Sequence, residues 1–66
     1  MDKEIRVSII ESKVQHLDMA SALIQENIEL GISPKEGGPS FEQMLSDNLA
    51  KKQALLELKK EIQDEI

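Results

Sequence analysis

The apolar residues in the first half of the chain repeat with the period of an α-helix. Alternating steps of three and four residues link Val7, Ile10, Val14, Leu17, Ser21, Ile24 and Ile28. This spacing aligns side chains along one stripe of a helix, with one small polar interruption. Because no residue from 3 to 30 breaks a helix, the sequence predicts one long helix over 3–30, with Asp2 as its N-cap.

A second apolar strip lies on nearly the opposite side of the same predicted helix. When about 100 degrees of rotation is allowed per residue, this strip comprises Ile5, Ile9, His16, Met19, Leu23 and Leu30. One neighbouring helix cannot cover both strips. We therefore expect the first strip to pack within the chain and the second, called the outer strip, to form an oligomer interface or a partner-binding surface.

The second half of the chain predicts another helix over 41–65. Ser40 precedes it as an N-cap, and Gln43 three residues later completes the pattern of a capping box. Its broad apolar arc is interrupted by Asn48, Lys52 and Lys59. The expected seam between the two helices comprises Val7, Ile10, Val14, Leu17, Ile24, Ile28, Phe41, Met44, Leu45, Leu55, Leu58 and Ile62.

All glycines and prolines of the chain lie in the connecting stretch GISPKEGGPS. Gly31 suits the left-handed backbone conformation that ends many helices. Ser33, Pro34 and Glu36 have the order of an N-cap, a first helical residue and a capping-box acid, which predicts a single helical turn. The connection over 31–39 is therefore expected to be a structured corner and not a flexible tether.

Two amphipathic helices of similar length, joined by a short corner, predict an all-α fold. We expect an antiparallel, coiled-coil-like two-helix hairpin that forms one domain over 1–66. A chain of 66 residues hides a small share of its surface, and this one has no cysteine for a disulfide. Since a lone hairpin has a single seam, we expect either a homodimer in the form of a four-helix bundle or binding to a helical protein partner.

Thirteen acidic residues against eight basic ones give a net charge of -5. This charge opposes binding to phosphate backbones and anionic lipid, so neither nucleic acid nor a membrane is an expected partner. No apolar run approaches the roughly 20 residues that cross a bilayer, and no secretory signal is recognised, so a cytoplasmic location is expected. A solvated helix face, with acids interleaved, is expected for the basic cluster Lys51, Lys52, Lys59 and Lys60.

The residue types of a hydrolytic triad occur near the single histidine, but not in a usable arrangement. Asp18 points roughly 160 degrees away from His16 around the helix, and Ser12 has no oxyanion hole beside it. No spacing resembles an EF-hand loop or a Glu-x-x-His metal motif, and GGP lacks the ending of a phosphate-binding loop. We expect no enzymatic activity, no metal or other cofactor and no small-molecule ligand. His16 is expected in an interface, where its charge would make association sensitive to pH.

These features favour an interaction module that binds a helical partner through aliphatic strips: a small chaperone, an adaptor or an assembly factor. The layout of two helices around a glycine-containing turn in a short acidic chain resembles the helical-hairpin chaperones that shield secretion needle subunits. It is also similar to compact RNA-regulating helical dimers, and fold alone does not imply function. One alternative is an acidic inhibitor that imitates nucleic acid and occupies a basic protein site. A second is a purely structural oligomerisation segment. Direct nucleic-acid binding through the basic cluster ranks below the interaction module and the acidic inhibitor.

Overall fold

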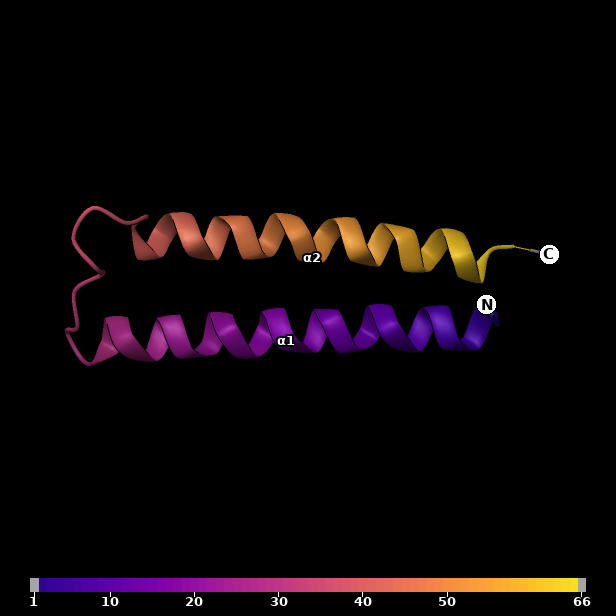
Figure 1. The fold of residues 1–66 in the computed structure, drawn as a ribbon, viewed down its shortest axis with the longest axis horizontal. Helices are drawn as coiled ribbons and strands as arrows, with labels where there is room; N and C mark the ends of the chain where they lie inside the picture. Colours follow the sequence, from indigo (N-terminus) through magenta and orange to yellow (C-terminus); the bar gives the residue numbers. More distant parts are fainter. Residues whose placement is uncertain (1, 66) are drawn as a thin grey trace.

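The chain forms two long helices joined by a loop. In the computed structural model, which describes residues 2–65, α1 covers Lys3–Glu29 and α2 covers Phe41–Gln63. The helices lie side by side and antiparallel, with both chain ends at one end of the molecule and the loop at the other (Figure 1). The principal dimensions are 48 × 16 × 15 Å. The predicted all-α helical hairpin is confirmed.

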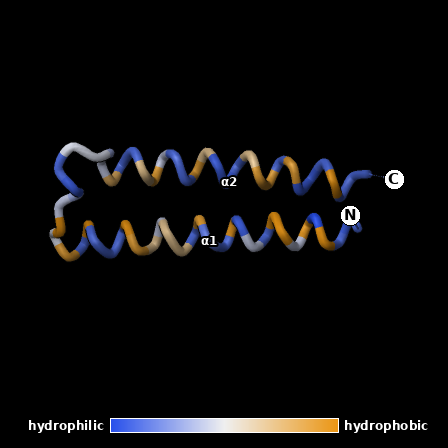
Figure 2. Tube along the Cα trace, in the orientation of Figure 1, coloured by the Kyte–Doolittle hydropathy of each residue, from blue (hydrophilic) through white to orange (hydrophobic). Residues whose placement is uncertain are grey.

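A narrow apolar seam holds α1 against α2. Among the described residues, only Ile10 and Ile62 are buried, with 5% and 6% of their surface exposed. Half-buried residues complete the seam, from α1 chiefly Val7, Val14, Leu17, Ser21 and Ile24, and from α2 Phe41, Met44, Leu45, Asn48, Lys52, Leu55 and Lys59. Figure 2 shows hydrophobic positions on the side of α1 that faces α2 and also on the side that faces away. The core is therefore thin, and much apolar surface of α1 lies outside it.

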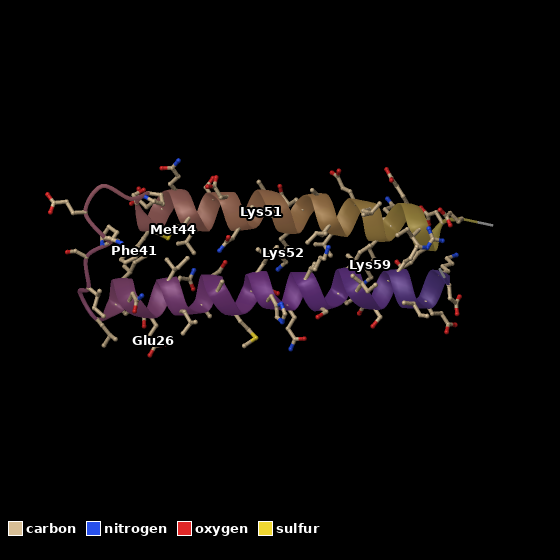
Figure 3. All side chains as sticks on the ribbon, in the orientation of Figure 1. Glu26, Phe41, Met44, Lys51, Lys52 and Lys59 are labelled. Atoms are coloured by element: carbon tan, nitrogen blue, oxygen red, sulfur yellow. The ribbon has the colours of Figure 1, made fainter. Side chains whose placement is uncertain are left out.

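Two lysines of α2 reach across the seam to acids of α1. Lys52 Nζ lies 2.8 Å from Asp18 Oδ1, and Lys59 Nζ lies 3.9 Å from Glu11 Oε2. Both lysines lie between the two helices in Figure 3. Their stems cover apolar seam surface while the ammonium groups reach carboxylates that are more than half exposed. Exposed ion pairs of this kind contribute roughly 0 to 1 kcal/mol each to the free energy of folding. Their main effect is therefore to favour this alignment of α1 and α2.

A polar layer crosses the seam near the middle of the hairpin. The Asn48 amide Nδ2 donates a hydrogen bond to Ser21 Oγ at 3.3 Å, and both side chains are half-buried. A polar residue at a seam position generally fixes the register of two packed helices at some cost in stability. Ser21, which interrupts the apolar periodicity of α1, is thus matched by a polar partner on α2.

Basic residues of the first turn of α1 fasten the open end of the hairpin. Lys3 Nζ donates hydrogen bonds to the backbone carbonyl oxygens of Gln63 and Glu65, at 3.0 and 2.9 Å. The Arg6 guanidinium lies 3.1 Å from the Glu65 carboxylate. The last carbonyl groups of a helix lack intrahelical partners and carry partial negative charge, which makes a nearby cation favourable. These contacts hold the start of α1 against the end of α2.

The two helices begin in different ways. Ser40 Oγ accepts a hydrogen bond from the backbone N–H of Gln43 at 3.1 Å, and α2 begins at the next residue, Phe41. Asp2 occupies the N-cap position of α1, but its side chain makes no capping hydrogen bond. At their far ends the helices stop at Glu29 and Gln63, before the expected residues 30 and 65.

The loop begins with a helix-ending motif built around Gly31. This residue has a φ of 75°, in the left-handed region. Its backbone N–H donates to the carbonyl of Ile28 at 3.1 Å, and the N–H of Ile32 donates to the carbonyl of Asn27 at 2.9 Å. The two bonds satisfy carbonyl groups that the end of α1 would otherwise leave unpaired, which is the Schellman arrangement.

The single helical turn predicted from Ser33, Pro34 and Glu36 does not form. A tight turn follows instead, closed by a hydrogen bond from the backbone N–H of Gly38 to the carbonyl of Lys35 at 3.1 Å. Gly37 has a φ of 81°, the left-handed value that a type II turn requires at its third residue. The preference of glycine for this conformation outweighs the capping pattern before it.

Candidate functional site

The outer strip of α1 is uncovered along its length. Its apolar members are between 41% and 67% exposed, and Leu23 near its centre is 62% exposed. His16 is exposed as well. In Figure 3, the side chain of Glu26, near the end of α1, points away from α2. Nothing among the described residues therefore covers this side of the helix.

Part of the outer strip forms a regular row with a period of seven residues: Ile9, His16, Leu23 and Leu30. A row on α2 has the same period: Met44, Lys51 and Leu58. His16 of the first row and Lys51 of the second line the same groove, so the rows flank one face of the hairpin. We call this surface the heptad face. Side chains seven residues apart lie in line along a helix, so each row runs along one side of the groove.

The groove at the centre of the heptad face lies between α1 and α2. It is lined by Lys13, His16, Leu17, Lys51, Ala54 and Leu55. Leu17 and Leu55 are half-buried and belong to the seam, whereas the two lysines and His16 are exposed. No carboxylate is among these lining residues. The groove, called the lysine groove below, thus offers an apolar floor beside positive charge.

The opposite side of the hairpin, called the acidic side below, holds the acids that lie along the seam. Three depressions follow the seam there, and their charged lining residues are Glu4, Glu11 and Asp18 together with Lys3, Lys52 and Lys59. Lys13 and Asp18 are five residues apart in α1, which separates them by about 140 degrees around the helix. A chain with a net charge of -5 therefore carries a locally positive groove on one side of its seam.

The lysines of the groove differ from those of the seam in having no acidic partner. Within residues 2–65, neither Lys13 nor Lys51 makes a side-chain hydrogen bond or an ion pair within 4.0 Å, whereas Lys52 and Lys59 both pair with acids of α1. Asp47 lies one turn before Lys51 and is the nearest acid by helical spacing, yet it does not line the groove. The charge of the groove is therefore left available to an incoming group.

The structure distributes the residues singled out from the sequence over both surfaces. Ile28 and Leu58, expected in the seam, are 46% and 45% exposed, and Leu58 belongs to the heptad face. The basic cluster is divided, because Lys51 lines the lysine groove while Lys52 and Lys59 lie in the seam. The sequence alone does not single out Lys13, because Lys13 and Lys51 line one groove only when the two helices pack together.

The residue types of a hydrolytic triad are not brought together. His16 lines the lysine groove, whereas Asp18 lies on the acidic side and accepts a hydrogen bond from Lys52. Within the described part of the chain, no group of three or more metal-ligating side chains lies close enough to hold an ion. What this surface offers chemically is exposed aliphatic area next to positive charge.

Over residues 2–65, neither helix combines the length and apolar character needed to cross a membrane. Comparison of the chain with protein-family models, with curated proteins and with solved structures gives no match.

Proposed function

We propose that this chain is a non-enzymatic protein–protein interaction module, in the manner of a small chaperone, adaptor or assembly factor, and that it binds a helical partner. The observation that supports this most is the heptad face, where an exposed row of α1 and a partly exposed row of α2 flank one groove. The exposed aliphatic side chains of these rows suit the apolar side of another helix.

The thin core supports the same proposal. Only Ile10 and Ile62 are buried among residues 2–65, while Leu23, Leu30 and Leu58 remain between 45% and 67% exposed. Fully covering one large aliphatic side chain stabilises a complex by roughly 1.5 to 3 kcal/mol. A helix laid along the heptad face would therefore complete a core that the hairpin alone leaves open.

A homodimer in the form of a four-helix bundle is one version of this proposal, with each heptad face covering the other. Two-fold symmetry would then place the lysine grooves of both copies in one interface. The lining of the two grooves would then bring four lysines and no carboxylate into the interface. Repulsion between these lysines opposes association, so a different protein is the better-supported partner.

Replacing Leu23 by aspartate tests the proposed function. Leu23 is 62% exposed and lies at the centre of the heptad face, so the variant is expected to keep its fold but to lose association. A carboxylate in place of a leucine that the partner covers in the complex should weaken partner binding by at least about tenfold. The measurement is quantitative affinity capture from the native host with mass spectrometry, together with sedimentation at several concentrations.

Leu49→Asp is the matched control, because Leu49 is 56% exposed and lines the acidic side of the hairpin. Circular dichroism should show the same helix content for both variants. The proposal predicts that Leu49→Asp retains the partner that Leu23→Asp loses. If Leu23→Asp left both capture and sedimentation unchanged, the chain would not use this face for association.

A further inference from the structure

The lysine groove distinguishes among the helices that this chain can accept. Its floor is formed by Leu17 and Leu55, and Lys13 and Lys51 stand at its rim, one from each helix. We propose that this groove binds an acidic amphipathic helix of another protein, whose apolar ridge lies over the two leucines and whose carboxylates pair with the two lysines. The inference rests on the proposed function and specifies the chemistry of the partner.

The geometry is that of a coiled coil with charged flanks. In such structures apolar residues fill the seam while glutamates and lysines beside it pair across the helices and select partner and orientation. The row Met44, Lys51 and Leu58 supplies a positive charge between two apolar side chains on α2. On α1, Lys13 lies beside the row that contains Ile9 and His16. A partner helix with carboxylates on both flanks of its apolar ridge matches this arrangement.

The acids along the seam of a second copy already have partners. The carboxylates of Glu11 and Asp18 lie 3.9 and 2.8 Å from Lys59 and Lys52 of their own chain. Engaging them with another groove would require those pairs to be shared or broken. The symmetric alternative places like charges together. These two carboxylates of a second copy are therefore a less direct match for the groove than the unpaired carboxylates of another helix.

Extended polyanions are a poor match as well. The net charge of -5 repels a nucleic acid strand or an anionic membrane at distances near the screening length, which is about 8 Å at physiological salt. A single helix with a few carboxylates is short enough to respond mainly to the two nearby lysines. The floor of the groove also favours aliphatic side chains, and the only aromatic residue of the chain, Phe41, lies elsewhere, at the start of α2.

The test uses two labelled, blocked helical peptides of three heptads each. Both carry leucine at the seam positions, and the flanking positions are glutamate in one peptide and lysine in the other. Fluorescence anisotropy is measured with the full chain, with Lys13→Gln/Lys51→Gln, and with Lys35→Gln/Lys60→Gln, which removes the same charge from the loop and from an exposed site of α2. Circular dichroism verifies that each variant is helical.

The chain should bind the glutamate peptide at least about tenfold more tightly than the lysine peptide at low salt. Lys13→Gln/Lys51→Gln should weaken binding of the glutamate peptide about tenfold and remove most of the salt dependence of that binding. Lys35→Gln/Lys60→Gln should change the affinity for this peptide less than about twofold. Equal affinity for the two peptides, equal losses in the two double variants, or no binding of either peptide would overturn the inference.

Other occupants of the groove would give distinct results. Displacement of the glutamate peptide by a single-stranded oligonucleotide of equal charge would assign the groove to phosphate polyanions. Self-association that depends on Lys13 and Lys51 in sedimentation would assign it to a second copy, and either outcome contradicts an acidic helical partner. If both peptides bound equally and Leu23→Asp abolished both, the interaction function would stand while the acidic partner would not.

Discussion

Replacing Ile10 by alanine is expected to lower the free energy of unfolding by about 3 kcal/mol. Ile10 is one of the two buried residues in the described chain and has 5% of its surface exposed. The substitution removes apolar area from the seam and leaves a gap that two rigid helices close only in part. Small domains are stable by roughly 5 to 15 kcal/mol, so this variant should be partly unfolded at warm temperatures. Urea denaturation followed by circular dichroism measures the effect.

Ile9→Ala provides the matched control for this prediction. Ile9 is the preceding residue of α1, undergoes the same chemical change, and is 41% exposed on the outer strip. In the isolated chain its replacement should cost less than about 1 kcal/mol. Equal destabilisation by the two substitutions would show that α1 is not packed on α2 through the seam that contains Ile10.

Replacing the polar seam residues of α2 by leucine should stabilise the isolated hairpin by about 3 kcal/mol in total, roughly 1 kcal/mol at each position. The triple variant is Asn48→Leu, Lys52→Leu and Lys59→Leu. The carboxylates left behind by the two lysines are more than half exposed, so water solvates them at little cost. The apolar side chains then cover more of the seam than an amide and two ammonium-bearing stems do. We expect a rise in the melting temperature of more than about 10 °C.

A control for the triple variant changes lysines outside the seam. Lys51→Leu and Lys60→Leu alter the same residue type at exposed positions of α2 and should shift the melting temperature by only a few degrees, within about 0.5 kcal/mol each. Both proteins are measured at several concentrations, because added leucines can promote self-association. A triple variant that melts below the unchanged chain would mean that Asn48, Lys52 and Lys59 do not lie between the helices.

The hairpin could be predicted because its signals are local. The alternating spacing of Ile10, Val14 and Leu17 favours one helix, Ser40 and Gln43 indicate the start of the other, and the glycines between them favour a bend. The conformation of the loop was harder to predict from the sequence. Two weak local preferences competed there, and the left-handed φ of Gly37 prevailed over the capping pattern of Ser33 and Glu36.

The composition of the seam on α2 required knowledge of the opposite helix. Apolar periodicity treats Asn48, Lys52 and Lys59 as interruptions, because each is polar when considered alone. Their position between the helices depends on Ser21, Asp18 and Glu11, which lie across from them in the antiparallel register. The lysine groove could not be predicted for the same reason, because Lys13 and Lys51 are far apart in sequence and line one groove only after the chain folds back.

The most direct test of the central proposal is photocrosslinking in the native host with a light-activated apolar residue at position 23. The same residue at position 53, which is exposed on α2, serves as the control. If the heptad face is the partner-binding surface, position 23 should yield one main adduct of defined mass and position 53 should not. Adducts of the same mass and yield from both positions, or none from position 23 of the folded chain, would contradict the proposal.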